Sequence, residues 1–158
     1  MIASDKLLKL WQRCDAVPGG KRLFSTVFSA QAPYFFTINP LLTKIEPGTA
    51  VAEMADRPWK RNHIKSVHAI AMCNLAEYVV GAVAVASIPD DIRWIPSGMQ
   101  VQYTKVAHGK LTATATVATE FRSGKYVEPV KIDVTDASGE TVFRAVVDMH
   151  MSPKKKAA

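Results

Sequence analysis

Residues 66–87, SVHAIAMCNLAEYVVGAVAVAS, decide how the rest of the chain is arranged. This stretch is apolar nearly all round the helical wheel, which is typical of a helix enclosed by protein. It is longer than an ordinary strand, so a helix is favoured even though valine also suits strands. Ser66 is the expected N-cap, and Pro89 prevents the helix from continuing.

The same stretch is long enough to cross a membrane, but its polar residues argue against a membrane span. Asn74 and Glu77 interrupt the apolar run, and a carboxylate in lipid costs several kcal/mol. The first residues do not show the charged, apolar and small-residue order of a signal peptide. We therefore predict no membrane span and a cytoplasmic location.

The segments on either side of this helix predict the remaining elements. Apolar residues at helical spacing favour helices over residues 4–14 and 21–30. Residues 36–45 and 49–54 are expected to form a hairpin around Pro47-Gly48. After Asp90 the apolar residues alternate, which predicts four successive strands joined by tight turns, over residues 100–106, 110–121, 126–136 and 141–151.

This order of elements predicts an α+β fold in which a six-stranded antiparallel sheet curls around one long central helix. Residues 1–153 are expected to form a single domain, with residues 1–33 as an N-terminal helical segment and residues 154–158 as a disordered basic tail. The 158 residues are 48% hydrophobic and 22% charged, as in ordinary globular domains.

Charge and cysteine content exclude several classes of function. The net charge of +6 is modest, and the basic residues are not interleaved with aromatic residues along one element, so no nucleic-acid partner is expected. Cys14 and Cys73 stand in separate apolar stretches away from any His cluster, so we predict reduced thiols and no metal site.

Glu77 is the strongest candidate for chemistry, because an ionisable group within an apolar helix is costly unless it has a partner or a task. A carboxylate in an apolar cleft suits a general base or a nucleophile. The alternative is a structural carboxylate that caps a backbone group or pairs with a basic residue.

The start of the same helix supplies a second candidate site. Its first N–H groups are unpaired, and the N–H of Ala69 can hold an oxyanion that develops on a carbonyl group. His68 lies nine residues before Glu77, about 13 Å along the helix axis and on the opposite side. The two ends can meet only if two helices pack antiparallel in a dimer, which predicts sites at the interface. A histidine that merely bonds a backbone carbonyl is the alternative.

Residues 62–77, NHIKSVHAIAMCNLAE, carry a family resemblance. They resemble the motif of hotdog-fold acyl-CoA thioesterases of the phenylacetate-pathway type, in which Asn, His-Gly-Gly and an acidic residue recur at this spacing. The stretch Leu111-Thr-Ala-Thr-Ala resembles the strand that follows the central helix in that family. The resemblance covers residues 36–151.

The resemblance implies a hotdog fold and hydrolysis of an acyl-CoA or acyl-carrier thioester by a homodimer or homotetramer. Glu77 would activate water or attack the thioester, Ala69 would supply the oxyanion N–H, and Asn62 would hold the thioester oxygen. His68 would assist, and Ser97 would orient water. Coenzyme A enters only as part of the substrate, with no separate cofactor.

The basic residues just before this motif are expected to bind the phosphates of coenzyme A. They are Arg57, Lys60, Arg61 and Lys65. A solvated charged loop is the alternative interpretation.

One departure from the motif leaves other functions open. His-Gly-Gly has become His68-Ala69-Ile70, which points to a thioesterase-like branch without an assigned activity. The branched Ile70 favours a module that binds acyl-CoA or a fatty acyl group without turnover. A hydroxyacyl-thioester dehydratase, with His68 and Glu77 paired across an interface, is a further alternative.

Overall fold

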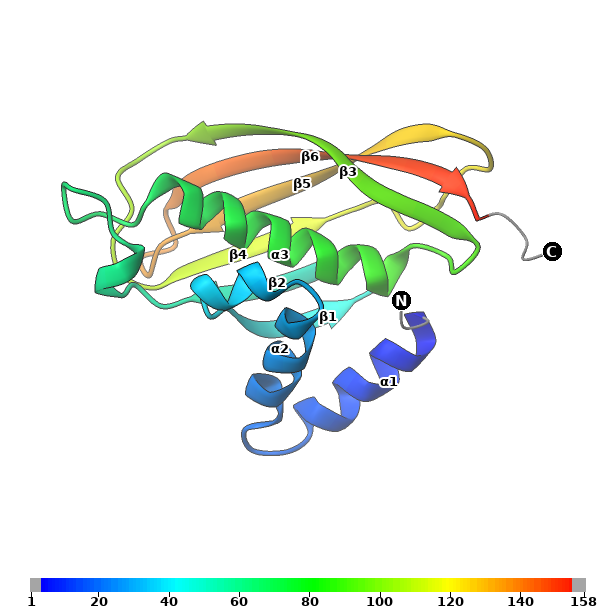
Figure 1. Ribbon diagram of the computed structural model, residues 1–158, viewed down its shortest axis with the longest axis horizontal. Helices are drawn as coiled ribbons and strands as arrows, with labels where there is room; N and C mark the ends of the chain where they lie inside the picture. The colour runs from blue at the N-terminus through cyan, green and yellow to red at the C-terminus, as the bar shows by residue number, and fades with distance from the viewer. Residues whose placement is uncertain (1–3, 155–158) are drawn as a thin grey trace.

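The computed structural model describes residues 4–154, which form one six-stranded antiparallel sheet curled around a long helix (Figure 1). The helices are α1 (Ser4–Asp15), α2 (Gly20–Ala30) and α3 (Ala69–Ser87), with short 3-10 helices η1 (Pro33–Thr37) and η2 (Pro58–Lys60). The strands are β1 (Leu41–Glu46), β2 (Thr49–Met54), β3 (Ile92–Tyr103), β4 (Leu111–Thr116), β5 (Tyr126–Thr135) and β6 (Thr141–Pro153). This is the hotdog arrangement, so the predicted fold is confirmed.

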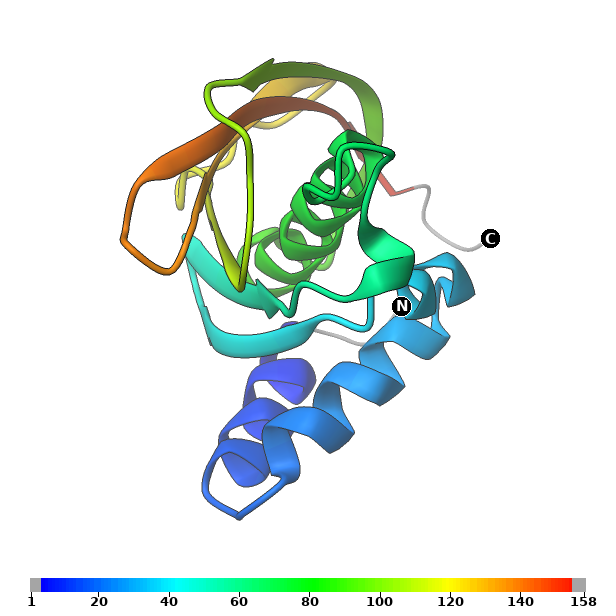
Figure 2. The same ribbon diagram turned by 90° about the vertical axis from the view of Figure 1, so that its left-hand side faces the viewer.

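The central helix α3 lies in the concave side of the sheet, as Figure 2 shows. Small side chains let it approach, because four of the six inward positions of β2 and β4 are fully buried alanines, Ala50, Ala52, Ala113 and Ala115. By length and composition α3 could cross a membrane, but 61% of its apolar window is buried inside the structure. Its apolar character is therefore accounted for by the protein core.

The strand order is β1-β2-β4-β5-β6-β3, which corrects one part of the prediction. The hairpin β1–β2 and the run β4–β5–β6 are confirmed, but β3 pairs with β6 at the sheet edge and makes no hairpin with β4. Strand β3 also begins at Ile92, eight residues before the predicted start. Pro96 and Gly98 look like strand breakers, yet an edge strand tolerates both at a bulge, where the register shifts.

Three predicted boundaries also differ from the structure. The expected strand over residues 36–45 is a 3-10 helix, η1, followed by β1, and β4 stops at Thr116 instead of residue 121. Helix α3 begins at Ala69, because the N-cap is His68 and not Ser66. The Nδ1 atom of His68 accepts a hydrogen bond from the N–H of Ile70 at 3.1 Å, which satisfies one of the first helical N–H groups.

The N-terminal helices α1 and α2 pack beside β1 and α3 and share their hydrophobic core. Aromatic rings make the connection, because Tyr78 of α3 meets the rings of Phe28 and Phe35 edge-on at 5.4 and 5.0 Å. At the other end, the N–H of Lys154 donates to the carbonyl of Asp91 at 2.8 Å, so Lys154 is held by the fold. The rest of the predicted tail lies outside the described residues.

Candidate functional site

Glu77 lies on the one side of α3 that the sheet does not cover. Contrary to the expectation of an enclosed carboxylate, its side chain is exposed in the single chain, and no hydrogen bond or ion pair to it is found within residues 4–154. It stands beside an apolar cavity of about 230 Å³ between α2, η1, α3 and β3. The other lining residues are Phe28, Gln31, Ala32, Phe35, Val80, Gly81, Val85, Trp94 and Pro96.

The start of α3 lies apart from Glu77, as the helical geometry predicts. No hydrogen bond from the Ala69 N–H is found within the described part of the chain, so this N–H is open to an oxygen atom from outside. Ala69 and Asn62 line one cavity, whereas His68 and Ile70 line another. Neither cavity includes Glu77, so a single chain does not unite the predicted catalytic groups.

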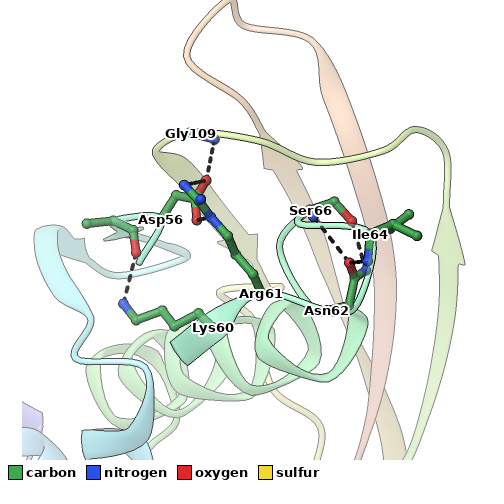
Figure 3. A network of polar contacts seen from close by, with 8 residues as sticks. Asp56, Lys60, Arg61, Asn62, Ile64, Ser66 and Gly109 are labelled. Carbon is green, nitrogen blue, oxygen red and sulfur yellow. Dashed lines mark hydrogen bonds and ion pairs between the residues drawn. The ribbon is translucent and has the colours of Figure 1, made fainter. Parts of the chain in front are cut away.

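Asn62 stabilises the loop in front of α3. Its Oδ1 accepts hydrogen bonds from the N–H groups of Ile64 and Ser66 at 3.1 and 3.2 Å, and its Nδ2 donates to the Ser66 hydroxyl at 2.8 Å (Figure 3). These bonds close the loop in front of α3, as asparagine side chains often do. Within residues 4–154 only one of the two Nδ2 hydrogens is used, so the other can still reach a ligand in the cavity that Asn62 lines.

Ser97 occupies the bulge in β3, between Pro96 and Gly98. Its hydroxyl donates to the carbonyl oxygen of Asp148 at 3.0 Å, which fixes the bulge against β6. Because Pro96 lines the cavity that Glu77 borders, Ser97 lies next to that cavity without being one of its lining residues.

The four predicted phosphate ligands fall into different environments. Lys60 is only 4% exposed, and its ammonium donates to the carbonyl oxygens of Ile38 and Ala55. Lys60 therefore has a structural role and is not available to a phosphate. Burial lowers the pKa of Lys60 to about 8. Arg61 makes a two-point ion pair with Asp56 at 2.8 and 3.1 Å, visible in Figure 3, and this contact holds the pKa of Asp56 below its ordinary value.

Lys65 and Arg57 remain exposed to solvent. Lys65 sits on the loop in front of α3 with a left-handed backbone (φ 64°). Arg57 lines a cavity of about 420 Å³ together with Arg22, Lys110 and Trp59. Sequence spacing could not identify Arg22 and Lys110 as its neighbours, because they come from α2 and from the segment before β4.

Two cavities border α3 one after the other, and the basic cavity adjoins the first of them. The basic cavity around Arg57 shares Trp59 and Lys60 with a middle cavity of about 330 Å³, which reaches α3 at Ile70 and Asn74. One turn further along the helix, Glu77 borders the apolar cavity. Within the described residues, no group of three His, Cys, Asp or Glu side chains could hold a metal ion.

Solved structures share this architecture. A crystal structure of the structural genomics target APC5556 is 33% identical, covers 96% of this chain and 99% of its own, and superposes with a TM-score of 0.79. PA5026 from Pseudomonas aeruginosa, a protein of unknown function described as a probable thioesterase, is 20% identical over 87% of this chain and 97% of its own, with a TM-score of 0.76. A hypothetical thioesterase from Streptococcus pneumoniae, solved with coenzyme A, is 16% identical over 83% of this chain and 98% of its own, with a TM-score of 0.68.

The two more distant structures establish the hotdog fold, in agreement with the motif in residues 62–77. No curated protein matches the sequence. A family model matches residues 20–151, which include α2, the whole sheet except its last two residues, and the central helix. The chain therefore belongs to the family described as a domain of unknown function, DUF4442.

Proposed function

We propose that the protein hydrolyses acyl thioesters, with coenzyme A as the thiol carrier. The observation that carries this proposal is Glu77, an exposed carboxylate beside an apolar cavity and about one helical turn from the middle cavity, which Lys60 and Arg61 also line. Such a site suits a substrate with an apolar acyl end and a polar carrier end. The hotdog relatives described as thioesterases, one of them solved with coenzyme A, support the same function.

The reaction needs a base for water and a donor for the oxyanion. Glu77 accepts a proton from water, whose oxygen forms a bond to the thioester carbon. The carbonyl oxygen becomes an oxyanion that an N–H group such as that of Ala69 can hold. The carbon–sulfur bond then breaks, and the thiolate takes up the proton from Glu77, which leaves a free acid and a free thiol.

Two copies of the chain are required for this arrangement, because Ala69 and Glu77 lie eight residues apart on one helix, about 12 Å along its axis. Strand β3 offers the surface for a second copy. It is a 12-residue edge strand whose outer edge is unpaired, and Val101, Tyr103 and Ile95 are all at least 40% exposed. Antiparallel pairing of two β3 strands would bring the start of one α3 toward the middle of the other.

The apolar cavity sets an expected acyl length. Along α3 it extends from Glu77 to Val85, eight residues or about 12 Å. An extended chain advances about 1.2 Å per bond, so about ten bonds fit. We therefore propose a medium-length aliphatic acyl group, with the phosphates of coenzyme A near Arg57 at the basic cavity. A cytoplasmic location and the lack of a resident cofactor remain predictions.

The test measures thiol release from coenzyme A thioesters of short, medium and long acyl chains. Glu77→Gln keeps the size of the side chain but removes the base, so hydrolysis should fall by about 100-fold or more. Glu120→Gln, on an exposed loop residue, is the matched control and should behave as wild type. Equal rates for Glu77→Gln and wild type would disprove the assignment.

Acyl-CoA binding without turnover is the second candidate. Ile70, 54% exposed beside the helix start, favours it, because a branched side chain there narrows the approach to the Ala69 N–H. Tight binding of acyl-CoA by wild type, with no thiol released from any substrate, would support this function over hydrolysis.

A further inference from the structure

We propose that Asn74 is a ligand-binding residue whose side-chain oxygen accepts a hydrogen bond from the first amide N–H of the pantetheine arm. This inference rests on the proposed function, since it places the thioester carbon at Glu77. Asn74 is a polar residue in the apolar helix α3, and neither its charge nor the motif singles it out.

The observation behind the proposal is a buried acceptor without a donor. Asn74 is only 6% exposed, and its Oδ1 is the one buried side-chain nitrogen or oxygen atom of residues 4–154 that lacks a hydrogen-bond partner. Buried polar groups nearly always have a partner, and one without a partner costs stability. A role in ligand binding would explain why the fold contains this unpaired oxygen.

The orientation of this amide is determined by its neighbours. Asn74 Nδ2 donates to the hydroxyl oxygen of Thr37 at 3.2 Å. That hydroxyl gives its own proton to the carbonyl of Tyr34 at 2.7 Å, so toward Asn74 it can only accept. The amide must therefore present its N–H₂ to Thr37, which leaves Oδ1 in need of a donor from elsewhere.

The residues around Asn74 indicate which kind of hydrogen-bond donor can bind to its Oδ1. Asn74 lines the middle cavity with apolar neighbours such as Ile38, Trp59 and Ile70. Lys60 and Arg61 line the same cavity, so a cationic donor would be repelled. A neutral N–H group on a slender, partly apolar chain fits this environment.

The position of Asn74 matches the chemistry of the pantetheine arm. Asn74 precedes Glu77 by three residues, about 4.5 Å along the helix axis and toward the basic cavity. In an acyl-CoA, four bonds separate the thioester carbon from the first amide nitrogen, about 5 Å at about 1.2 Å per bond. When the acyl chain lies beyond Glu77 and the phosphates lie near Arg57, the first amide N–H of the pantetheine arm lies beside Asn74.

The experiment compares two thioesters that differ only in the substituent on the amide nitrogen, hydrogen in one and methyl in the other. One is the medium-chain acyl thioester of N-acetylcysteamine, and the other is its N-methyl analogue, which keeps the amide carbonyl but has no N–H. Wild type should prefer the first by about tenfold in kcat/KM, and Asn74→Leu should abolish the preference. An unchanged preference in Asn74→Leu, or none in wild type, overturns the proposal.

Two further measurements separate this inference from its premise and from a structural role. If wild type hydrolyses neither of these compounds nor any coenzyme A thioester, hydrolysis as a function has failed, and calorimetric binding of the same two compounds tests Asn74 by the same tenfold criterion. Asn74→Leu should leave the melting temperature unchanged or raise it, because it removes an unpaired buried acceptor. A lower melting temperature with equal loss for both thioesters would mark Asn74 as purely structural.

Discussion

Lys60→Met is expected to change how the stability of the protein depends on pH. Lys60 is a buried lysine whose ammonium donates to the carbonyl oxygens of Ile38 and Ala55. Burial, followed by the nearby charges of Arg57 and Arg22, lowers its pKa from 10.5 to about 8. In the unfolded chain the ordinary value is restored, so the folded and unfolded states release this proton at different pH.

The sign follows from the proton count. Below about pH 8 both states carry the proton. The lowered pKa, about 8 against 10.5, means that the charged Lys60 costs the folded state about 3 kcal/mol relative to the unfolded state. Between about pH 8 and pH 10.5 the folded state has released the proton while the unfolded state still holds it, so the unfolding free energy rises with pH. From about pH 7 to pH 10 the rise due to Lys60 is about 2.5 kcal/mol.

Urea unfolding at several pH values between about 7 and 10 measures this contribution. The readout is the slope of the unfolding free energy against pH, because Lys60→Met also loses two hydrogen bonds to carbonyl groups, which shifts its stability by an amount that does not depend on pH. Wild type should gain about 2.5 kcal/mol relative to Lys60→Met over this range, whereas Lys131→Met, at an exposed position on β5, should run parallel to wild type. Parallel curves for wild type and Lys60→Met would refute the reasoning.

Two other predictions concern the substrate cavity and the assembly. A methyl group on Gly81 would lie 3.8 Å from the Phe28 ring, in ordinary contact, so Gly81→Ala should fold and keep its activity. Gly81→Leu should displace about two methylenes of a medium acyl chain, at about 0.8 kcal/mol each. This corresponds to a roughly tenfold loss in kcat/KM for medium acyl-CoAs, whereas short acyl-CoAs should react as with wild type. An equal loss for both chain lengths would count against the cavity as the acyl site. Val101→Lys on β3 should shift the sedimentation coefficient toward that of a monomer and reduce hydrolysis in parallel. Val127→Lys, on the interior strand β5, should change neither. A monomeric wild type that hydrolyses thioesters would contradict the two-copy site.

Much of the architecture could be predicted from local patterns. The apolar run ending at Ser87 has no continuous polar face, so a central helix wrapped by the sheet follows from hydrophobicity alone. The alternation of Thr and Ala in β4 similarly indicates one packed face. Strand β3 could not be placed in this way, because its pairing with β6 joins distant segments and its bulge at Ser97 hides the strand period.

For the candidate site, residue types indicate which side chains can do chemistry, whereas packing in the folded chain fixes which of them are available to a ligand. Glu77 stands out in sequence because a charge within an apolar helix is costly, but its exposure depends on which side of α3 the sheet leaves open. Lys60 and Arg57 look alike in sequence, yet the Lys60 ammonium is buried against two backbone carbonyls, whereas the Arg57 side chain is exposed to solvent. The unpaired oxygen of Asn74 appears only in three dimensions, because hydrogen bonding depends on groups that the fold brings together from distant parts of the chain.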